Sequence, residues 1–533
     1  MKKENKMSKG QNLRAKGKKL RAKGKKWFGS LLRRRILVIV FLLLQIFFIG
    51  YYLIAHTMAS EIIRNILFVF SIAVVIHVIS KNDVGAYRLI WVFLILLFPV
   101  LGGILYVMVR FQSSTKRFEQ STIETEAKRF KYLTLCENDH EKALKEMPDC
   151  KNQINYLQHY AGFPIYGNTT AEYFPSGEDK LECLLEELEK AEHYIFLEYF
   201  IVQEGKMWDS ILDVLKRKAA AGVKVKFIYD DFGCFFLLPN NYPKQLKKYG
   251  IECAVFNPFR PILSVVQNNR DHRKIISIDG KVCFTGGVNL ADEYINEIEK
   301  YGHWKDSAIM IKGKAAWSFT LVFLQMWEMC SGSNENYSDY FPWKEEKCVT
   351  GTDGFVQPYA NSPLDDKSIA EGVYLQIINN AKKYIYITTP YLIIDDNMFT
   401  ALTLAAESGV DVRIITPHKW DKFLVHMTTR SYYHDLISAG IRIYEYSKGF
   451  IHSKNFVSDD HTATVGTINL DYRSLYLHFE CGVQLYDNQA ITAIKKDFLD
   501  TLEVCHEITA EETKKNIFIQ IIQDILRMFA PLM

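Results

Sequence analysis

The sequence predicts an α/β protein in which N-terminal transmembrane helices precede two pseudo-twofold-related α/β halves that share one active site. Three observations favour this fold class. Long uncharged runs are confined to the first 110 of the 533 residues. The rest of the chain repeats its own pattern of strands and helices, and one short motif of titratable residues occurs once in each repeat.

A basic tail opens the chain. Residues 1–35 contain fifteen Lys or Arg and one acid, and the heptapeptide Leu-Arg-Ala-Lys-Gly-Lys-Lys stands at 13–19 and again at 20–26. Such a run beside a membrane helix keeps its end of the chain in the cytoplasm and is attracted to anionic headgroups. We expect a cytoplasmic tail that mainly orients the first helix.

Residues 36–110 are predicted to form a membrane anchor of two or three helices. The uncharged runs 36–55 and 89–109 are long enough to cross a bilayer core, whereas 66–79 is marginal. A cleavable signal peptide is the alternative for the first run, although its apolar region would be shorter. Arg110 favours a cytoplasmic end after the last run, which is consistent with two spans and a re-entrant middle run.

The part of the chain beyond a charged connector at 111–160 is an internal repeat. A buried strand, a helix and a second strand are expected at 191–230 in a first half, 161–345, and again at 381–417 in a second half, 346–510. Strands that alternate with helices predict βαβ units. Two such halves packed face to face would place their sites at one interface.

The last segment, residues 511–533, is predicted to be an amphipathic helix. Its apolar residues recur at helical spacing from 517 to 529. Such a helix either lies on a membrane surface near the active site or packs onto its own domain.

The strongest signal is a motif of the form HxKxxxxD that occurs once in each half. In an extended strand the His and the Lys point to the same face. Two ammonium groups would then neutralise a phosphate, while one imidazole attacks phosphorus and the other protonates the leaving oxygen. Incidental His and Lys on surface strands are the alternative. The motif residues and the Asn that follows each copy are His272, Lys274, Asp279 and Asn289, and His452, Lys454, Asp459 and Asn469.

Charge and cysteine spacing disfavour other kinds of site. Residues 111–533 carry a net charge of −12, which argues against a nucleic-acid partner. None of the ten cysteines forms a CxxC pair, so we expect neither a disulfide framework nor a zinc site. We also expect no metal or other cofactor, because the lysines supply the charge that a metal ion would supply.

These motifs resemble the phospholipase D superfamily and, within it, the bacterial cardiolipin synthases. The resemblance runs from about residue 62 to the C-terminus. It implies a phosphatidyl-histidine intermediate on His272, with His452 as general acid and then base, and the reverse order remains open. It also implies that the two motif lysines and the two asparagines hold the phosphate oxygens.

The resemblance further implies roles for acidic residues. Asp306 and Glu480 match the carboxylates that orient the two imidazoles, whereas the motif acids Asp279 and Asp459 are more readily structural. Glu198 matches an acid near the pocket, and a polar residue at a strand edge is the alternative. The chain departs from the family pattern in having Gly287 where a Ser is frequent and His478 where an Asn is usual.

The leading hypothesis from these features is a phosphatidyltransferase embedded in the bacterial plasma membrane. It would condense two phosphatidylglycerol molecules into cardiolipin and release glycerol, with anionic membrane lipids as its partners. The alternative is a phospholipase D or a transferase with another alcohol acceptor. A nuclease and a non-catalytic membrane scaffold are less consistent with the charge and with the intact motifs. The sequence does not indicate the oligomeric state.

Overall fold

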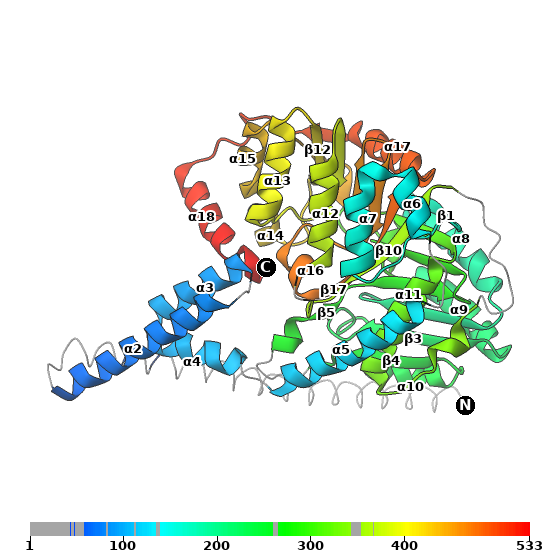
Figure 1. Ribbon diagram of the computed structural model, residues 1–533, viewed down its shortest axis with the longest axis horizontal. Helices are drawn as coiled ribbons and strands as arrows, with labels where there is room; N and C mark the ends of the chain where they lie inside the picture. The colour runs from blue at the N-terminus through cyan, green and yellow to red at the C-terminus, as the bar shows by residue number, and fades with distance from the viewer. Residues whose placement is uncertain are drawn as a thin grey trace, which may run out of the picture. The chain divides into compact units, whose positions relative to one another are not determined.

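The computed structural model describes residues 43, 47, 58–81, 84–110, 113–134, 139–259, 265–342, 353–365 and 367–533. The chain divides into two compact units. One unit contains the N-terminal helices up to Ser114 together with residues 259–267, and the other contains both α/β halves (Figure 1). The predicted basic tail and most of the run 36–55 lie outside the described residues.

The N-terminal unit contains α2 (Met58–Ser80), α3 (Gly85–Leu97) and α4 (Pro99–Arg110), which pack around Val74, Val78, Ile95 and Tyr106. The uncharged run 89–109, predicted to be long enough to cross a bilayer, is divided between α3 and α4. The helix breaks at the residue before Pro99, with φ −133° and ψ 73°, because a proline disfavours the helical conformation of its predecessor. Of the helices described, none is both long and apolar enough to cross a membrane.

The second unit begins with the segment predicted to be a connector, and this segment is helical. It contains α5 (Ser113–Leu133), α6 (His140–Glu146) and α7 (Lys151–Asn155). Lys128 on α5 forms an ion pair of 2.5 Å with Glu328 on α11 (Ala316–Ser331). Residues Ala316 to Glu328 of α11 are all buried, and this helix packs against strands of both sheets.

The first sheet has seven strands in the order β1-β9-β7-β6-β2-β3-β4. The pairs β2–β3 and β3–β4 are parallel and the others antiparallel. The bounds are β1 (Thr169–Phe174), β9 (Ala308–Gly313), β7 (Val282–Gly286), β6 (Lys274–Ile278), β2 (Tyr194–Tyr199), β3 (Lys224–Asp230) and β4 (Glu252–Phe256).

The second sheet repeats this order and these directions as β10-β17-β16-β15-β11-β12-β13, with β18 added antiparallel at the edge. The prediction of two similar α/β halves is therefore confirmed. The bounds are β10 (Phe355–Asn361), β17 (His478–Tyr486), β16 (Thr462–Gly466), β15 (Asn455–Ser458), β11 (Tyr384–Thr388), β12 (Asp411–Pro417), β13 (Arg442–Tyr446) and β18 (Cys505–Glu507).

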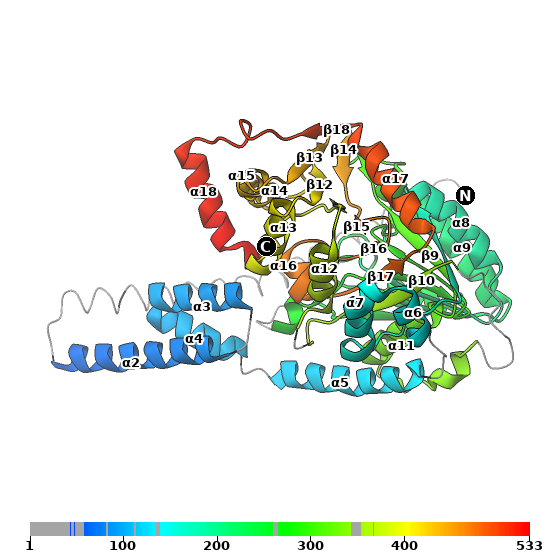
Figure 2. The same ribbon diagram turned by 45° about the horizontal axis from the view of Figure 1, so that its top comes forward.

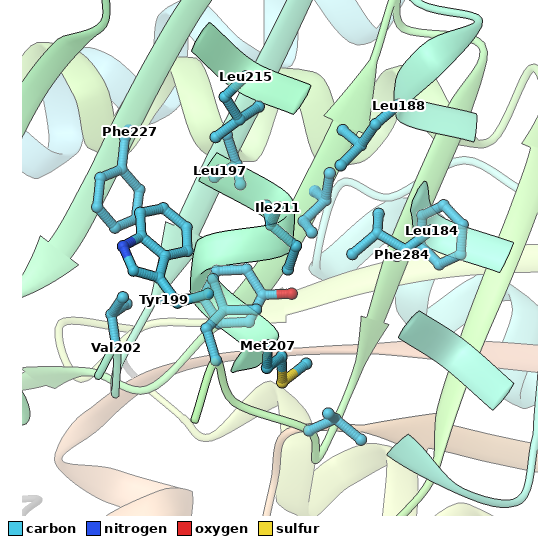
Figure 3. Close-up of a cluster of buried hydrophobic side chains, with 14 of the residues drawn as sticks. Leu184, Leu188, Leu197, Tyr199, Val202, Met207, Ile211, Leu215, Phe227 and Phe284 are labelled. Carbon is cyan, nitrogen blue, oxygen red and sulfur yellow. The ribbon is translucent and has the colours of Figure 1, made fainter. Parts of the chain in front are cut away.

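Helices in equivalent positions cover the sheets. In the first half α8 (Gly177–Glu189) and α9 (Lys206–Ala220) pack on β2 and β3 through a buried apolar cluster that includes Leu184, Ile211 and Phe227 (Figure 3). In the second half the matching helices are α12 (Ile369–Asn380) and α13 (Asp396–Glu407). The N-cap serine of α8 and that of α12 each accept a hydrogen bond from the third amide of the helix, which fixes both helix starts.

Two short ladders join the halves. β5 (Arg270–Asp271) runs parallel to the start of β17, and β8 (His303–Lys305) runs parallel to β14 (Gly449–Ile451). A motif histidine directly follows the end of each ladder. It lies beside a strand of the opposite half. The fold thus carries both motif histidines to the boundary between the halves.

Candidate active site

The motif histidines are fixed by backbone hydrogen bonds across the boundary. The amide of His272 donates to the carbonyl of Phe479 over 2.9 Å, and the amide of His452 donates to the carbonyl of Lys305 over 2.7 Å. Both contacts extend the short parallel ladders by one residue. The position of each imidazole therefore depends on the backbone of the opposite half.

Each imidazole is also paired with a carboxylate of the opposite half. His272 Nδ1 lies 2.8 Å from Glu480 Oε1, and His452 Nδ1 lies 2.7 Å from Asp306 Oδ2. Both carboxylates are fully buried. The sequence predicts these two acids as partners of the histidines, and the structure adds that the pairs are crossed. Among the described residues, each motif histidine thus has its carboxylate partner in the opposite half and not in its own.

The pair of His452 and Asp306 combines a neutral imidazole with an ionised carboxylate. Burial, and to a lesser extent Lys454, lower the pKa of His452 to about 4 against the raising effect of Asp306. Burial alone would raise the pKa of Asp306, but His452 and Lys454 outweigh it and the pKa is lowered. A carboxylate placed in this way stabilises the imidazolium that forms when His452 takes up a proton.

The pair of His272 and Glu480 has a different charge state. Burial lowers the pKa of His272 well below its usual value, with further contributions from Lys274 and His478. Burial raises the pKa of Glu480 to about 8, although Lys274 and a hydrogen bond from Thr467 act in the opposite direction. Both groups are therefore mostly neutral at pH 7, so the two motif histidines are not electrostatically equivalent.

The ammonium group of each motif lysine contacts the backbone carbonyl of the histidine in the same motif. Lys274 Nζ donates to the carbonyl of His272 over 2.5 Å, and Lys454 Nζ makes the same contact with His452. Burial lowers the pKa of Lys274 to about 8 and that of Lys454 to about 7, and the second lysine is also repelled by the first. A bound phosphate would restore both charges, because it places anionic oxygens beside the two ammonium groups.

The two asparagines line the same cavity but have different contacts. Asn289 Oδ1 accepts from the amide of Ile201 over 3.1 Å, and its Nδ2 donates to the hydroxyl of Tyr294 over 2.7 Å. Asn469 Oδ1 is buried and has no hydrogen-bond partner within the described part of the chain. Asn289 is thus held in place by its neighbours, whereas Asn469 keeps hydrogen-bonding capacity for a ligand.

The motif aspartates close turns away from the histidines. Each has a positive φ, 50° for Asp279 and 55° for Asp459, at the end of β6 or β15 remote from the motif lysine. The carboxylate of each accepts three backbone amides at the start of the neighbouring strand. These contacts favour a structural role over proton transfer.

Glu198 does not reach the cavity. It is completely buried on β2, a central strand, and its Oε1 lies 3.6 Å from Arg273 Nη1. Burial raises its pKa, and nearby Asp271 adds to the effect. Glu198 therefore belongs to a buried charge cluster behind the site. It is neither an acid of the pocket nor a residue at a strand edge.

A cavity of about 900 Å³ contains both motif histidines, and its wall includes residues that the motifs did not reveal. Trp304 and Tyr294 lie beside His452, with ring centroids 5.4 and 5.7 Å away, and Phe200 lies 5.0 Å from His272. Their signal in the sequence is weak because aromatic residues are abundant in this chain. Further cavity residues are Phe232, Arg270, Lys300, Lys422, Phe423, Leu424, Arg473, His478, Leu532 and Met533.

Comparison with known proteins places this geometry in a family. Residues 184–327 and 374–502 match the family described as "Cardiolipin synthase, PLD-like domain", and 69–110 match the family described as "Phospholipase_D-nuclease N-terminal". A cardiolipin synthase of Alkalihalophilus pseudofirmus is 33% identical over 94% of this chain and 100% of its own length. Cardiolipin synthase 2 of Bacillus anthracis is 34% identical over 85% of this chain and 88% of its own.

A solved structure supports the fold independently. The phosphatidylserine synthase of Haemophilus influenzae Rd KW20 aligns with a TM-score of 0.52 at 16% identity, over 68% of this chain and 93% of its own. At that identity the likeness concerns the fold alone.

Proposed function

Because this chain belongs to the cardiolipin synthase family of phosphatidyltransferases, we propose that it condenses two phosphatidylglycerol molecules into cardiolipin and releases glycerol. The observation that carries the proposal is the pair of crossed His–carboxylate contacts in one cavity, above two buried lysines. This arrangement supplies a nucleophile, a proton donor and a cationic phosphate site without further groups.

In the proposed first step His272 attacks the phosphorus of one phosphatidylglycerol. The anionic phosphodiester favours uptake of a proton from solvent by His452 when the lipid binds. The P–N bond forms as the bond to the glycerol oxygen breaks, and His452 gives this proton to that oxygen. In the second step His452 takes the proton from a hydroxyl of another phosphatidylglycerol. That oxygen attacks phosphorus, the P–N bond breaks, and both histidines return to their starting states.

The assignment of the two histidines follows their surroundings. The acid–base residue must carry a positive charge during the cycle, and ionised Asp306 beside His452 favours that charge. The nucleophile must be an unprotonated imidazole, and His272 meets this condition because burial and the neighbouring cations disfavour its protonation. We therefore place the phosphatidyl group on His272.

The substrates are membrane lipids, and apolar surface on this chain supports membrane association. In the N-terminal unit α2 exposes Ile66, Phe68 and Val69 to more than half of their full surface. In the second unit α18 (Ile517–Met528), the red helix in Figure 2, exposes apolar side chains such as Phe518, Ile521 and Ile525. We infer that both surfaces contact the bacterial plasma membrane, aided by the basic residues of 1–35.

The direct test uses purified full-length protein with phosphatidylglycerol in mixed micelles containing EDTA, and the products are resolved by mass spectrometry. Cardiolipin and glycerol in equal amounts are expected, together with loss of turnover in His272→Ala. Phosphatidic acid as the only product would replace the proposal with a phospholipase D. A mixed ester in the presence of an added alcohol, without cardiolipin, would indicate another acceptor.

A further inference from the structure

A third histidine stands beside the proposed nucleophile. The ring of His478 lies 5.7 Å from that of His272, and its Nδ1 lies 3.9 Å from Glu480 Oε1. His478 is 9% exposed and lines the cavity. Neither of its ring nitrogens has a hydrogen-bond partner among the residues that the structure describes. A buried imidazole with two unsatisfied nitrogens is costly unless a ligand or water completes it.

The three side chains have the composition of a metal site. One ligand atom each from His272, His478 and Glu480 lies within 4.8 Å of the others. Two imidazoles and a carboxylate are a common ligand set for zinc, which leaves a fourth position for water or substrate. Ligand atoms around a tetrahedral zinc ion are about 3.3 Å apart, so side-chain movements of about 1–2 Å would complete the site.

The charge states of these groups suit a metal ion. Burial lowers the pKa of both imidazoles, so each keeps a free electron pair at neutral pH. Metal binding requires the ionised carboxylate of Glu480, so any proton that it carries leaves for solvent. Five basic side chains oppose a cation electrostatically, namely Lys274, Lys454, Arg270, Lys422 and Arg473, whereas Asp471 favours one.

The other half of the molecule provides an internal comparison. Trp304 occupies the position equivalent to His478, two residues before the orienting acid Asp306, and its ring centroid lies 5.4 Å from that of His452 at an interplanar angle of 50°. The indole nitrogen of Trp304 is only a donor and cannot bind a metal. The asymmetry therefore confines a metal site to the nucleophile side.

We propose that His272, His478 and Glu480 bind a zinc-class divalent cation, and that the bound cation inhibits the enzyme. The cation would take an electron pair from each imidazole and from the carboxylate, and any proton on Glu480 would leave for solvent. His272 would then have no free electron pair for phosphorus. Metal binding stands independently of the proposed function, whereas the inhibition rests on it.

Binding is tested on EDTA-stripped full-length protein in detergent with Co²⁺ as the probe, because four-coordinate Co²⁺ absorbs strongly in the visible range. We expect one ion per chain and its displacement by Zn²⁺. His478→Asn and His478→Gln should each weaken binding about tenfold or more. His506→Asn, which alters an exposed histidine paired with Glu512, should bind like the wild type.

Three results would overturn the site. They are no Co²⁺ binding below about 100 μM, equal binding by the wild type and both His478 variants, or loss of binding in His506→Asn. Thermal unfolding of each variant without metal separates lost ligation from lost folding.

Inhibition is measured as the Zn²⁺ concentration that halves each variant's own rate of cardiolipin formation. We expect this concentration to rise about tenfold or more in His478→Asn. Equal sensitivity of wild type and variant would disprove inhibition through this site. Tight Co²⁺ binding without inhibition would instead argue against His272 as the nucleophile, and the metal site would stand.

Discussion

At the scale of single residues, the two motif histidines differ more than their identical motifs suggest. His452 faces an ionised carboxylate and two aromatic rings, whereas His272 faces a neutral carboxyl and another imidazole. The same backbone frame thus supports two electrostatic environments. Such a difference is what a reaction needs when one imidazole must accept phosphorus and the other must exchange protons.

Gly287 is predicted to be essential for the position of Asp306. A Cβ atom at residue 287 would lie 2.0 Å from Asp306 Oδ1, so any side chain must displace the carboxylate that holds His452. Gly287→Ser should lower kcat about 10- to 100-fold, because small displacements of catalytic groups carry such costs. Steady-state kinetics in mixed micelles measure the loss. Gly85→Ser is the control, since a Cβ atom at that residue would have only an arginine nitrogen within 4 Å, at an ordinary contact distance. A wild-type kcat in Gly287→Ser would contradict the argument.

The rate should fall on the alkaline side of neutrality. In the free enzyme the pKa of Lys454 is about 7 and that of Lys274 about 8, so rising pH removes the positive charge that binds phosphate. We expect kcat/KM to decrease between about pH 7 and 9, with a smaller decrease in kcat because bound phosphate raises both pKa values. Lys454→Arg should move the decrease to higher pH. A kcat/KM that stays constant to pH 9.5 would be inconsistent with neutral lysines in the free site.

At the scale of elements, the C-terminal helix connects the cavity with an apolar surface. α18 is attached to α14 (Phe423–Ser431) through Gln523, which donates to the carbonyl of Met427 over 3.1 Å. The residues that follow α18 end at Leu532 and Met533 in the cavity wall. The chain therefore leads from the exposed apolar residues of α18 directly to the wall of the cavity.

Disrupting that apolar surface should impair turnover only on bilayers. The double variant Ile521→Asp and Ile525→Asp places charges on two exposed apolar positions, which opposes insertion among acyl chains. We expect at least about a fivefold lower rate on phosphatidylglycerol vesicles and an unchanged rate on short-chain monomeric phosphatidylglycerol. Gln520→Asp on the same helix is the control. Equal losses on both substrates would show that α18 stabilises the domain instead.

At the scale of the whole molecule, the halves share one site because each short ladder pairs a segment of one half with a strand of the other. The repeat and the motifs could be predicted because they recur at matched positions along the chain, and the two orienting acids followed from the resemblance to the phospholipase D superfamily. The crossed pairing could not be predicted, since Glu480 lies 208 residues from His272 in sequence and only tertiary pairing of β5 with β17 joins them. The same limit hid the cluster around His478, whose members have no ligand spacing in sequence.

The crossed pairing predicts that variants group by pair and not by half. His452→Ala and Asp306→Asn should each lower the rate with phosphatidylglycerol about 100-fold or more, because both remove proton transfer to the leaving oxygen. A phosphatidyl ester of an acidic phenol needs no such proton. In the first turnover with that ester both variants should regain most of the wild-type rate of phenol release, whereas His272→Ala should not.

The release of the phenol, followed by absorbance, therefore identifies which histidine acts at phosphorus. Glu480→Gln, which lies in the second half, should behave like His272→Ala of the first half, although less severely. Rescue of His272→Ala in place of His452→Ala would reverse the two roles. Grouping of Asp306→Asn with His272→Ala would mean that each acid serves its own half, contrary to the 2.7 Å contact between Asp306 and His452.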